Sequence, residues 1–268
     1  MKLCFVVYFI IAILQFYHNS AVLNSKDEYG VAGQTVNNLA YNFVLLLPYI
    51  GLYSKNRKFS ITMILICSFF IVSGLKRGAI IAGCAGVVIY FYYWLVELKH
   101  RRITSNSILV LLLSLIGGGL IYHFVTQNLF LLERFTELAD GDSSGRDVIY
   151  STIWDYWLLS DPWNMIFGYG FDASIDIAGR SAHNDWLELL SATGLVGIVI
   201  YFTFFVSVVK LINISTISIY DKTMLMMIFT IWVFLSMFSM AYNDGGLSSM
   251  TTLMGYIVGK NEIRYAVK

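Results

Sequence analysis

His183 is the side chain in this sequence best suited to move a proton. It lies in the stretch SAHNDWLELL and is followed by Asn184, Asp185 and Glu188. A histidine titrates near neutral pH, so it can act as a general base or donate a proton to a leaving oxygen. A lone histidine is most often structural, but carboxylates at the edge of an apolar segment are candidate functional residues. We therefore take His183 as a candidate catalytic residue.

Arg146, in the stretch SSGRD, is the first of two cationic places that could bind an anion. The pattern predicts the start of a helix, with Ser144 as the N-cap and Asp147 three residues further on. Arg146 would then lie in the first turn, where free backbone N–H groups and the guanidinium both attract phosphate. A solvated arginine in an acidic loop is the alternative interpretation.

Lys76 and Arg77 form the second cationic place, and they interrupt an otherwise apolar sequence. A basic side chain at membrane depth costs about 2.5–3.5 kcal/mol on insertion scales, so the pair needs a compensating interaction. One hypothesis is that both side chains snorkel to the membrane surface from a helix end. The other is that they bind an anion.

The composition of the whole chain predicts a membrane protein. Its 268 residues are 57% hydrophobic and 13% charged, whereas a soluble domain carries about 25% charged residues. Apolar runs of about 18 or more residues recur, as expected for helices that cross a bilayer. We predict an all-α, polytopic integral membrane protein that forms a single membrane domain over residues 1–268. The net charge of +1 gives no indication of a nucleic-acid partner.

About eight transmembrane helices are expected, with one large loop, residues 127–185, outside the membrane. The predicted spans are residues 3–17, 36–53, 60–74, 78–96, 107–126, 186–212, 223–242 and 247–259. Within the loop, Ile149, Ile153 and Trp157 recur at helical spacing among other aromatic residues. This pattern predicts a short helix that lies in the membrane interface. Gly168–Gly170 follows no strand, so we interpret it as a tight turn and not as a nucleotide-binding motif.

The charges of the connecting segments predict the orientation in the membrane. One set, which includes both termini, is strongly basic, and the other, which includes the long loop, is acidic. The positive-inside rule then places both termini in the cytoplasm and the loop outside. Arg77, Arg146 and His183 would all lie at outward-facing helix N-termini, so we expect them to meet in one outer cavity. The candidate substrate-binding residues around them are Lys76, Asn184, Asp185, Glu188 and Arg180.

Four stretches together resemble the O-antigen ligase and O-antigen polymerase superfamily of bacterial membrane glycosyltransferases. They are SGLKRGAII at Ser73–Ile81, the Gly145–Arg146 pair, Gly168–Gly170, and His183–Gly197 with its Gly-Leu-Val-Gly end. The last stretch is the most specific, and the likeness covers most of the chain. Two features depart from the family pattern. Family members usually have more spans before the first arginine, and that arginine commonly follows a serine directly, whereas Lys76 intervenes here.

The resemblance implies transfer of a glycan from an undecaprenyl diphosphate carrier to an acceptor hydroxyl. The reaction would take place on the outer face of the bacterial cytoplasmic membrane, with no metal and no other cofactor. Arg77, or Lys76 in its place, would hold the diphosphate together with Arg146. His183 would help to activate the acceptor.

Polymerisation is the first functional hypothesis, in which the chain extends O-antigen, capsule or exopolysaccharide. The close alternative is an O-antigen ligase that joins the glycan to lipid A core. A lipid or glycan transporter, which would favour inverted repeats, and a non-catalytic assembly partner are alternatives of another class. The expected partners are the lipid-linked glycan, its glycan or lipid A-core acceptor, membrane lipids and a chain-length regulator.

Overall fold

The computed structural model describes residues 1–26, 36–99, 145–213, 217–239, 241 and 247–266, with isolated positions between 100 and 144. Every regular element in this described part is a helix, as the all-α prediction requires. The chain divides into two compact units, which are described separately here. The first consists of Met1–Phe135, Thr216–Ile231 and Gly245–Lys268, and the second of Thr136–Ser215 and Trp232–Asp244.

Four of the described helices are long and apolar enough to cross a membrane. They are α1 (Lys2–Lys26), α4 (Arg77–Lys99), α10 (Asp185–Asn213) and α11 (Ile219–Phe238). These helices overlap the predicted spans at residues 3–17, 78–96, 186–212 and 223–242. The length and apolar composition of these four helices therefore indicate a membrane protein.

The other predicted spans stay predictions. Their places are taken by α2 (Ala40–Ile50) with its 3₁₀ continuation η2 (Gly51–Tyr53), by α3 (Arg57–Ser73) and by α12 (Leu247–Ala266). With 11 residues, α2 is shorter than the roughly 20 residues that a helix needs to cross a bilayer. The predicted fifth span, residues 107–126, lies almost wholly outside the described residues.

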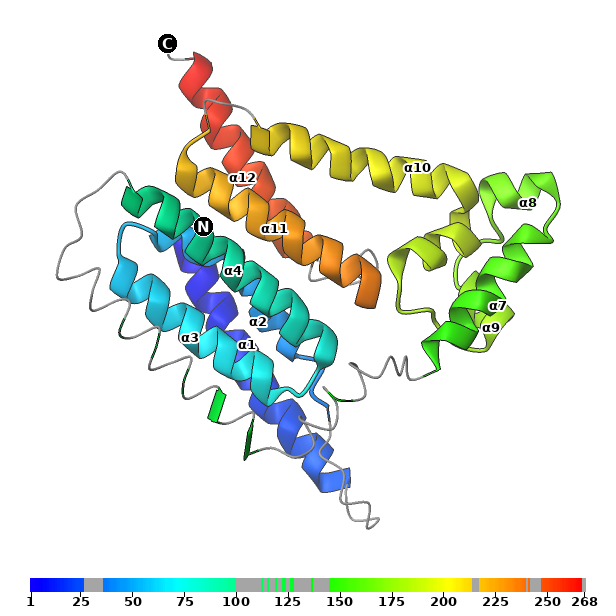
Figure 1. Cartoon of the computed structure of the whole chain (residues 1–268), viewed down its shortest axis with the longest axis horizontal. Helices are drawn as coiled ribbons and strands as arrows, with labels where there is room; N and C mark the ends of the chain where they lie inside the picture. The colour runs from blue at the N-terminus through cyan, green and yellow to red at the C-terminus, as the bar shows by residue number, and fades with distance from the viewer. Residues whose placement is uncertain are drawn as a thin grey trace. The chain divides into compact units, whose positions relative to one another are not determined.

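Helix α2 is the centre of the first unit (Figure 1). All of its residues except Asn42 are buried, and it packs against α1, α3, α4 and α12. The ring of Phe43 stacks on that of Phe70 in α3, with the ring centroids 4.5 Å apart. A helix that is apolar on all sides is stable only in such surroundings.

Asn37 connects α1 to the turn between α3 and α4. Its side chain is buried and donates to Phe16 O at 3.1 Å and to Ser20 Oγ at 3.1 Å. Its backbone N–H donates to Gly74 O at 2.9 Å. A Cβ atom on Gly74 would lie 2.5 Å from the Cβ of Ala40, so only glycine permits this approach. These contacts hold the chain just before Lys76 and Arg77.

The second unit contains α7 (Arg146–Leu158), α8 (Pro162–Phe167) and α9 (Ala173–Ala178) beside α10 (Figure 1). The residues predicted to share one face of α7, namely Ile149, Ile153 and Trp157, are its buried residues. Ile149 and Ile153 pack around Ala182, which is fully buried. The segment before α10 is thereby fixed to α7.

A sharp bend at Gly194 divides α10 into two arms (Figure 1). Gly194 has a φ of 61°, and a Cβ atom there would lie 2.5 Å from the carbonyl carbon of Ile166. Carbonyl groups just before such a break have no partner in their own helix. The N–H groups of Tyr169 and Gly170 donate to two of them, Ser191 O at 2.8 Å and Ala192 O at 2.9 Å. The Gly-Tyr-Gly turn therefore supports the bend.

Candidate functional site

Arg146 is the first residue of α7, as predicted, but the residue that caps the helix differs from the prediction. The N-cap is Gly145, with a φ of 75° and no side-chain cap. Ser144 was expected there because serine oxygens cap N-terminal N–H groups well. The left-handed backbone at Gly145 brings the chain into the helix instead, since glycine adopts this conformation without strain. Arg146 thus lies in the first turn of α7, where the backbone N–H groups have no partner within the helix.

His183 lies just outside α10 and not in its first turn. The helix begins at Asp185, and Asn184 is its cap, because Asn184 Oδ1 accepts from Trp186 N at 3.0 Å and Leu187 N at 3.2 Å. His183 is exposed and has a φ of 51°, a backbone conformation that few residues other than glycine adopt. Such conformations persist where the surroundings enforce them, and they concentrate at functional sites.

Arg146 and Asn184 both donate to the end of α11. Arg146 Nη1 lies 3.3 Å from Phe238 O, and Asn184 Nδ2 lies 3.3 Å from the preceding carbonyl, Met237 O. The contact places a cation at the negative end of the α11 dipole, which is favourable. Because a guanidinium has five N–H donors, this bond leaves most of its binding capacity unused. The fold thereby brings Arg146 close to the residue that follows His183.

Glu188 holds the chain on the other side of His183. It is 3% exposed, and its two oxygens accept from Ala182 N at 2.6 Å and Ser174 Oγ at 2.5 Å. The Ala182 bond fixes the residue directly before His183, while Asn184 fixes the residue directly after it. We infer that Glu188 positions the His183 backbone.

Asp185 connects the two arms of α10. It is fully buried, and Tyr201 OH donates to its Oδ2 at 2.5 Å. Trp232 Nε1 in α11 donates to the Tyr201 hydroxyl at 2.8 Å. Residues 16 positions apart on a straight helix would be about 24 Å apart, so this contact exists only because of the bend at Gly194.

The remaining cationic residues of the prediction fall in two places. Arg180 is exposed, and its Nη2 lies 3.5 Å from Gly145 O, next to the start of α7. Lys76 and Arg77 are half-buried at the start of α4, in the first unit, where Lys76 O accepts from Ile80 N at 3.0 Å. Their convergence with His183 stays a prediction.

Several residues of this site carried no recognisable signal in the sequence. Ser174 is one serine among many, and the carbonyls of Met237 and Phe238 are backbone groups. Tyr201 had a partial signal, because a buried tyrosine hydroxyl requires a hydrogen-bond partner and an acidic residue begins the same segment. Its partner could not be identified without knowing that α10 bends.

The second unit contains groups that can bind an anion and a group that can transfer a proton, and Arg146 and Asn184, which follows His183, donate to consecutive carbonyls there. It combines the N-terminus of a 13-residue helix, a guanidinium and an exposed imidazole. Within the described ranges, no group of three or more His, Cys, Asp or Glu side chains could hold a metal ion.

Comparison with known proteins relates this geometry to one family. No curated protein and no solved structure matches the chain. Residues 61–202 match the O-antigen ligase family, and the matched region is just over half of the chain. It begins in α3, ends in the second arm of α10, and includes Arg77, Arg146 and His183. The chain is therefore a membrane protein that belongs to the O-antigen ligase family.

Proposed function

We propose that the protein is a glycosyltransferase that moves a glycan from undecaprenyl diphosphate to an acceptor hydroxyl on the outer face of the cytoplasmic membrane. The observation that carries this proposal is the attachment of Arg146 and Asn184 to consecutive carbonyls at the end of α11. It brings Arg146, at the start of α7, close to Asn184, the residue that follows His183. A cation and the N–H groups of a helix N-terminus stabilise a diphosphate leaving group, and a hydroxyl nucleophile needs a base such as His183.

Each group has a role in the proposed reaction. His183 takes the proton of the acceptor hydroxyl as its oxygen attacks the anomeric carbon of the lipid-linked glycan. The bond between that carbon and the diphosphate oxygen breaks, and negative charge develops on the diphosphate. Arg146 and the first-turn N–H groups of α7 stabilise this charge, because both are hydrogen-bond donors that the fold holds at one helix end. Arg77, with Lys76 beside it, supplies the second cation in this proposal.

Two acceptors fit this chemistry. In polymerisation, a sugar hydroxyl of another lipid-linked glycan attacks, and the product grows by repeat units. In ligation, the hydroxyl belongs to lipid A core. Polymerisation is the first proposal, and ligation is the second because the matched family is described as O-antigen ligase. The eight-span topology, with both termini in the cytoplasm, belongs to the same proposal.

Transfer by the purified protein in lipid vesicles tests the function. The donor is an undecaprenyl-diphosphate-linked glycan, offered with either a second lipid-linked glycan or lipid A core. We expect a longer lipid-linked glycan with the first acceptor, and product formation that survives EDTA. Product with lipid A core alone would establish the ligase. Movement of the donor across the vesicle membrane without any product would favour a transporter and contradict the proposal.

A further inference from the structure

The first unit contains a cavity of about 630 Å³ whose lining does not include Lys76 or Arg77. Its size is within the range of about 300–1,000 Å³ that is usual for ligand sites. It is lined by residues from the start of α1, the η2–α3 connection, the start of α11 and the second half of α12. They are Met1, Lys2, Gly51, Leu52, Tyr53, Ser54, Lys55, Asn56, Ser218, Tyr220, Asp221, Met224, Tyr256 and Lys260.

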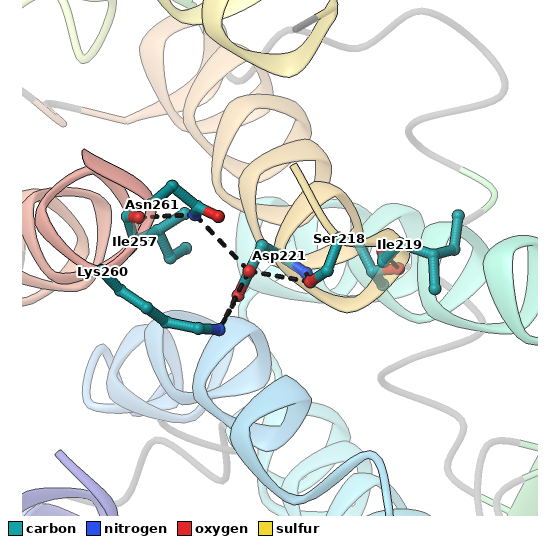
Figure 2. A network of polar contacts seen from close by, with 7 residues as sticks. Ser218, Ile219, Asp221, Ile257, Lys260 and Asn261 are labelled. Carbon is teal, nitrogen blue, oxygen red and sulfur yellow. Dashed lines mark hydrogen bonds and ion pairs between the residues drawn. The ribbon is translucent and has the colours of Figure 1, made fainter. Parts of the chain in front are cut away.

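One wall of this cavity is fixed by a buried carboxylate (Figure 2). Asp221, at the start of α11, is fully buried and pairs with Lys260 of α12, whose Nζ lies 2.6 Å and 2.9 Å from its two oxygens. Ser218 Oγ donates to Asp221 Oδ2 at 2.7 Å, and Asn261 Nδ2 lies 3.5 Å from the same oxygen. The carboxylate charge is therefore neutralised inside the wall, and the Lys260 side chain remains 31% exposed.

The lining carries two more lysines. The ammonium of Lys2 lies over the ring of Tyr53, 5.0 Å from its centroid, and Tyr53 OH donates to Lys2 O at 3.0 Å. Lys55 is exposed in the connection between η2 and α3. The lining thus contains three lysines and one carboxylate that is already paired, so it is cationic. Tyr220 and Met224 add apolar surface, which makes the cavity suitable for an amphiphilic anion.

The cavity lies at the other end of the first unit from the cations proposed to bind diphosphate. Helix α3 begins next to the lining residue Asn56 and ends at Ser73, three residues before Lys76. Its 17 residues span about 25 Å, roughly the thickness of the hydrocarbon core. The positive-inside rule places the lysine-rich end at the cytoplasmic leaflet. The cavity is therefore separate from the proposed transferase site.

We propose that this cavity binds the phosphate headgroup of an anionic phospholipid of the cytoplasmic leaflet. Basic pockets between transmembrane helices on that side suit such headgroups, because lysines neutralise the phosphate while aromatic and aliphatic walls contact the acyl region. A bound lipid would connect α1, α3, α11 and α12 at their cytoplasmic ends. The proposal is independent of glycosyl transfer.

Binding of short-chain phosphatidylglycerol to the full-length protein in detergent tests this site. The Lys2→Gln, Lys55→Gln double variant is compared with a control that loses the same charge outside the cavity, Lys58→Gln with Lys222→Gln. Each lysine near a phosphate contributes about fivefold in affinity, so we expect roughly 25-fold weaker binding in the cavity variant, which loses two. The control should stay within about threefold of the wild type.

Three further measurements identify the ligand: binding to an arginine variant, binding of phosphatidylcholine, and competition by inorganic phosphate. The Lys2→Arg, Lys55→Arg variant keeps the charge and should bind phosphatidylglycerol within about threefold of the wild type. Phosphatidylcholine should bind at least about tenfold more weakly than phosphatidylglycerol, because its headgroup carries no net charge. Equal binding of both lipids, equal loss in both glutamine variants, or competition by inorganic phosphate at the same concentration as the lipid would overturn the proposal.

Discussion

Replacement of Glu188 by alanine tests whether this residue acts as a positioning residue for His183. The carboxylate is buried and accepts two short hydrogen bonds, from Ala182 N and Ser174 Oγ. In the alanine variant the Ala182 N–H loses its acceptor in a dry environment. The residue before His183 is then no longer held, although nothing at the surface has changed.

The magnitude follows from the two bonds. A hydrogen bond to a charged group contributes about 1.5–3 kcal/mol, and a buried donor left unsatisfied costs about 1–3 kcal/mol. Together these predict that Glu188→Ala lowers the free energy of unfolding by about 3–5 kcal/mol. Glu188→Gln can keep both contacts, since its oxygen accepts from Ala182 and its amide donates to Ser174. Neutral bonds are roughly half as strong, so its expected cost is about 1–2 kcal/mol.

Hydrogen exchange at the Ala182 amide, combined with a transfer assay, measures this effect directly. A local loss of about 3 kcal/mol accelerates exchange on the order of 100-fold in Glu188→Ala. Glu188→Gln should exchange far more slowly than the alanine variant and keep most of the transfer activity. If the Ala182 amide exchanges at the wild-type rate in both variants while both lose transfer activity, Glu188 does not act by positioning His183. That result would mean that the Glu188 carboxylate contacts the substrate directly.

Three other substitutions probe the bend and the anion site. Tyr201→Phe removes a hydrogen bond to the buried Asp185 carboxylate and should lower the free energy of unfolding by about 1.5–3 kcal/mol in chemical unfolding. An unfolding midpoint equal to that of the wild type would argue against this contact between the two arms of α10. Gly194→Ala should cost at least about 2 kcal/mol in the same measurement. Gly259→Ala is the control, because it lies inside α12 with open space around its Cβ position, and it should leave the free energy of unfolding unchanged or raise it by up to about 1 kcal/mol. Arg146→Lys should weaken donor binding about tenfold or more, because lysine cannot grip a diphosphate bidentately. Equal losses in Arg146→Lys and Arg180→Lys would remove the special role of Arg146.

The helical class and most helix positions could be predicted from hydrophobic patterning. The four helices able to cross a membrane overlap predicted spans, and the buried face of α7 matches the predicted Ile149, Ile153 and Trp157. Apolar periodicity is a local property, so it is visible in the sequence. Helix lengths were less predictable, as α1 continues to Lys26, nine residues beyond the predicted span of residues 3–17.

The details of the site depended on interactions that a sequence does not display. The bend in α10 arises from one glycine and from the backbone of a turn more than 20 residues earlier, so residues 186–212 were expected as one straight span. His183 was expected at the N-terminus of the sixth span, and it lies two residues before Asp185, where α10 begins. The side-chain oxygen of Asn184 caps α10, so His183, the residue before the cap, lies outside the helix. Backbone acceptors such as Phe238 O have no sequence signature.

The proton transfer assigned to His183 is the central claim, and single-turnover kinetics of His183→Asn test it most directly. Asparagine tolerates the left-handed backbone found here, so this variant removes the base without disturbing the chain. We expect donor binding to stay near the wild-type value and the rate of the transfer step to fall by about 10²–10⁴-fold. His18→Asn, at an exposed position of α1, is the matched control and should transfer at the wild-type rate. A His183→Asn protein that transfers glycan as fast as the wild type would contradict the account.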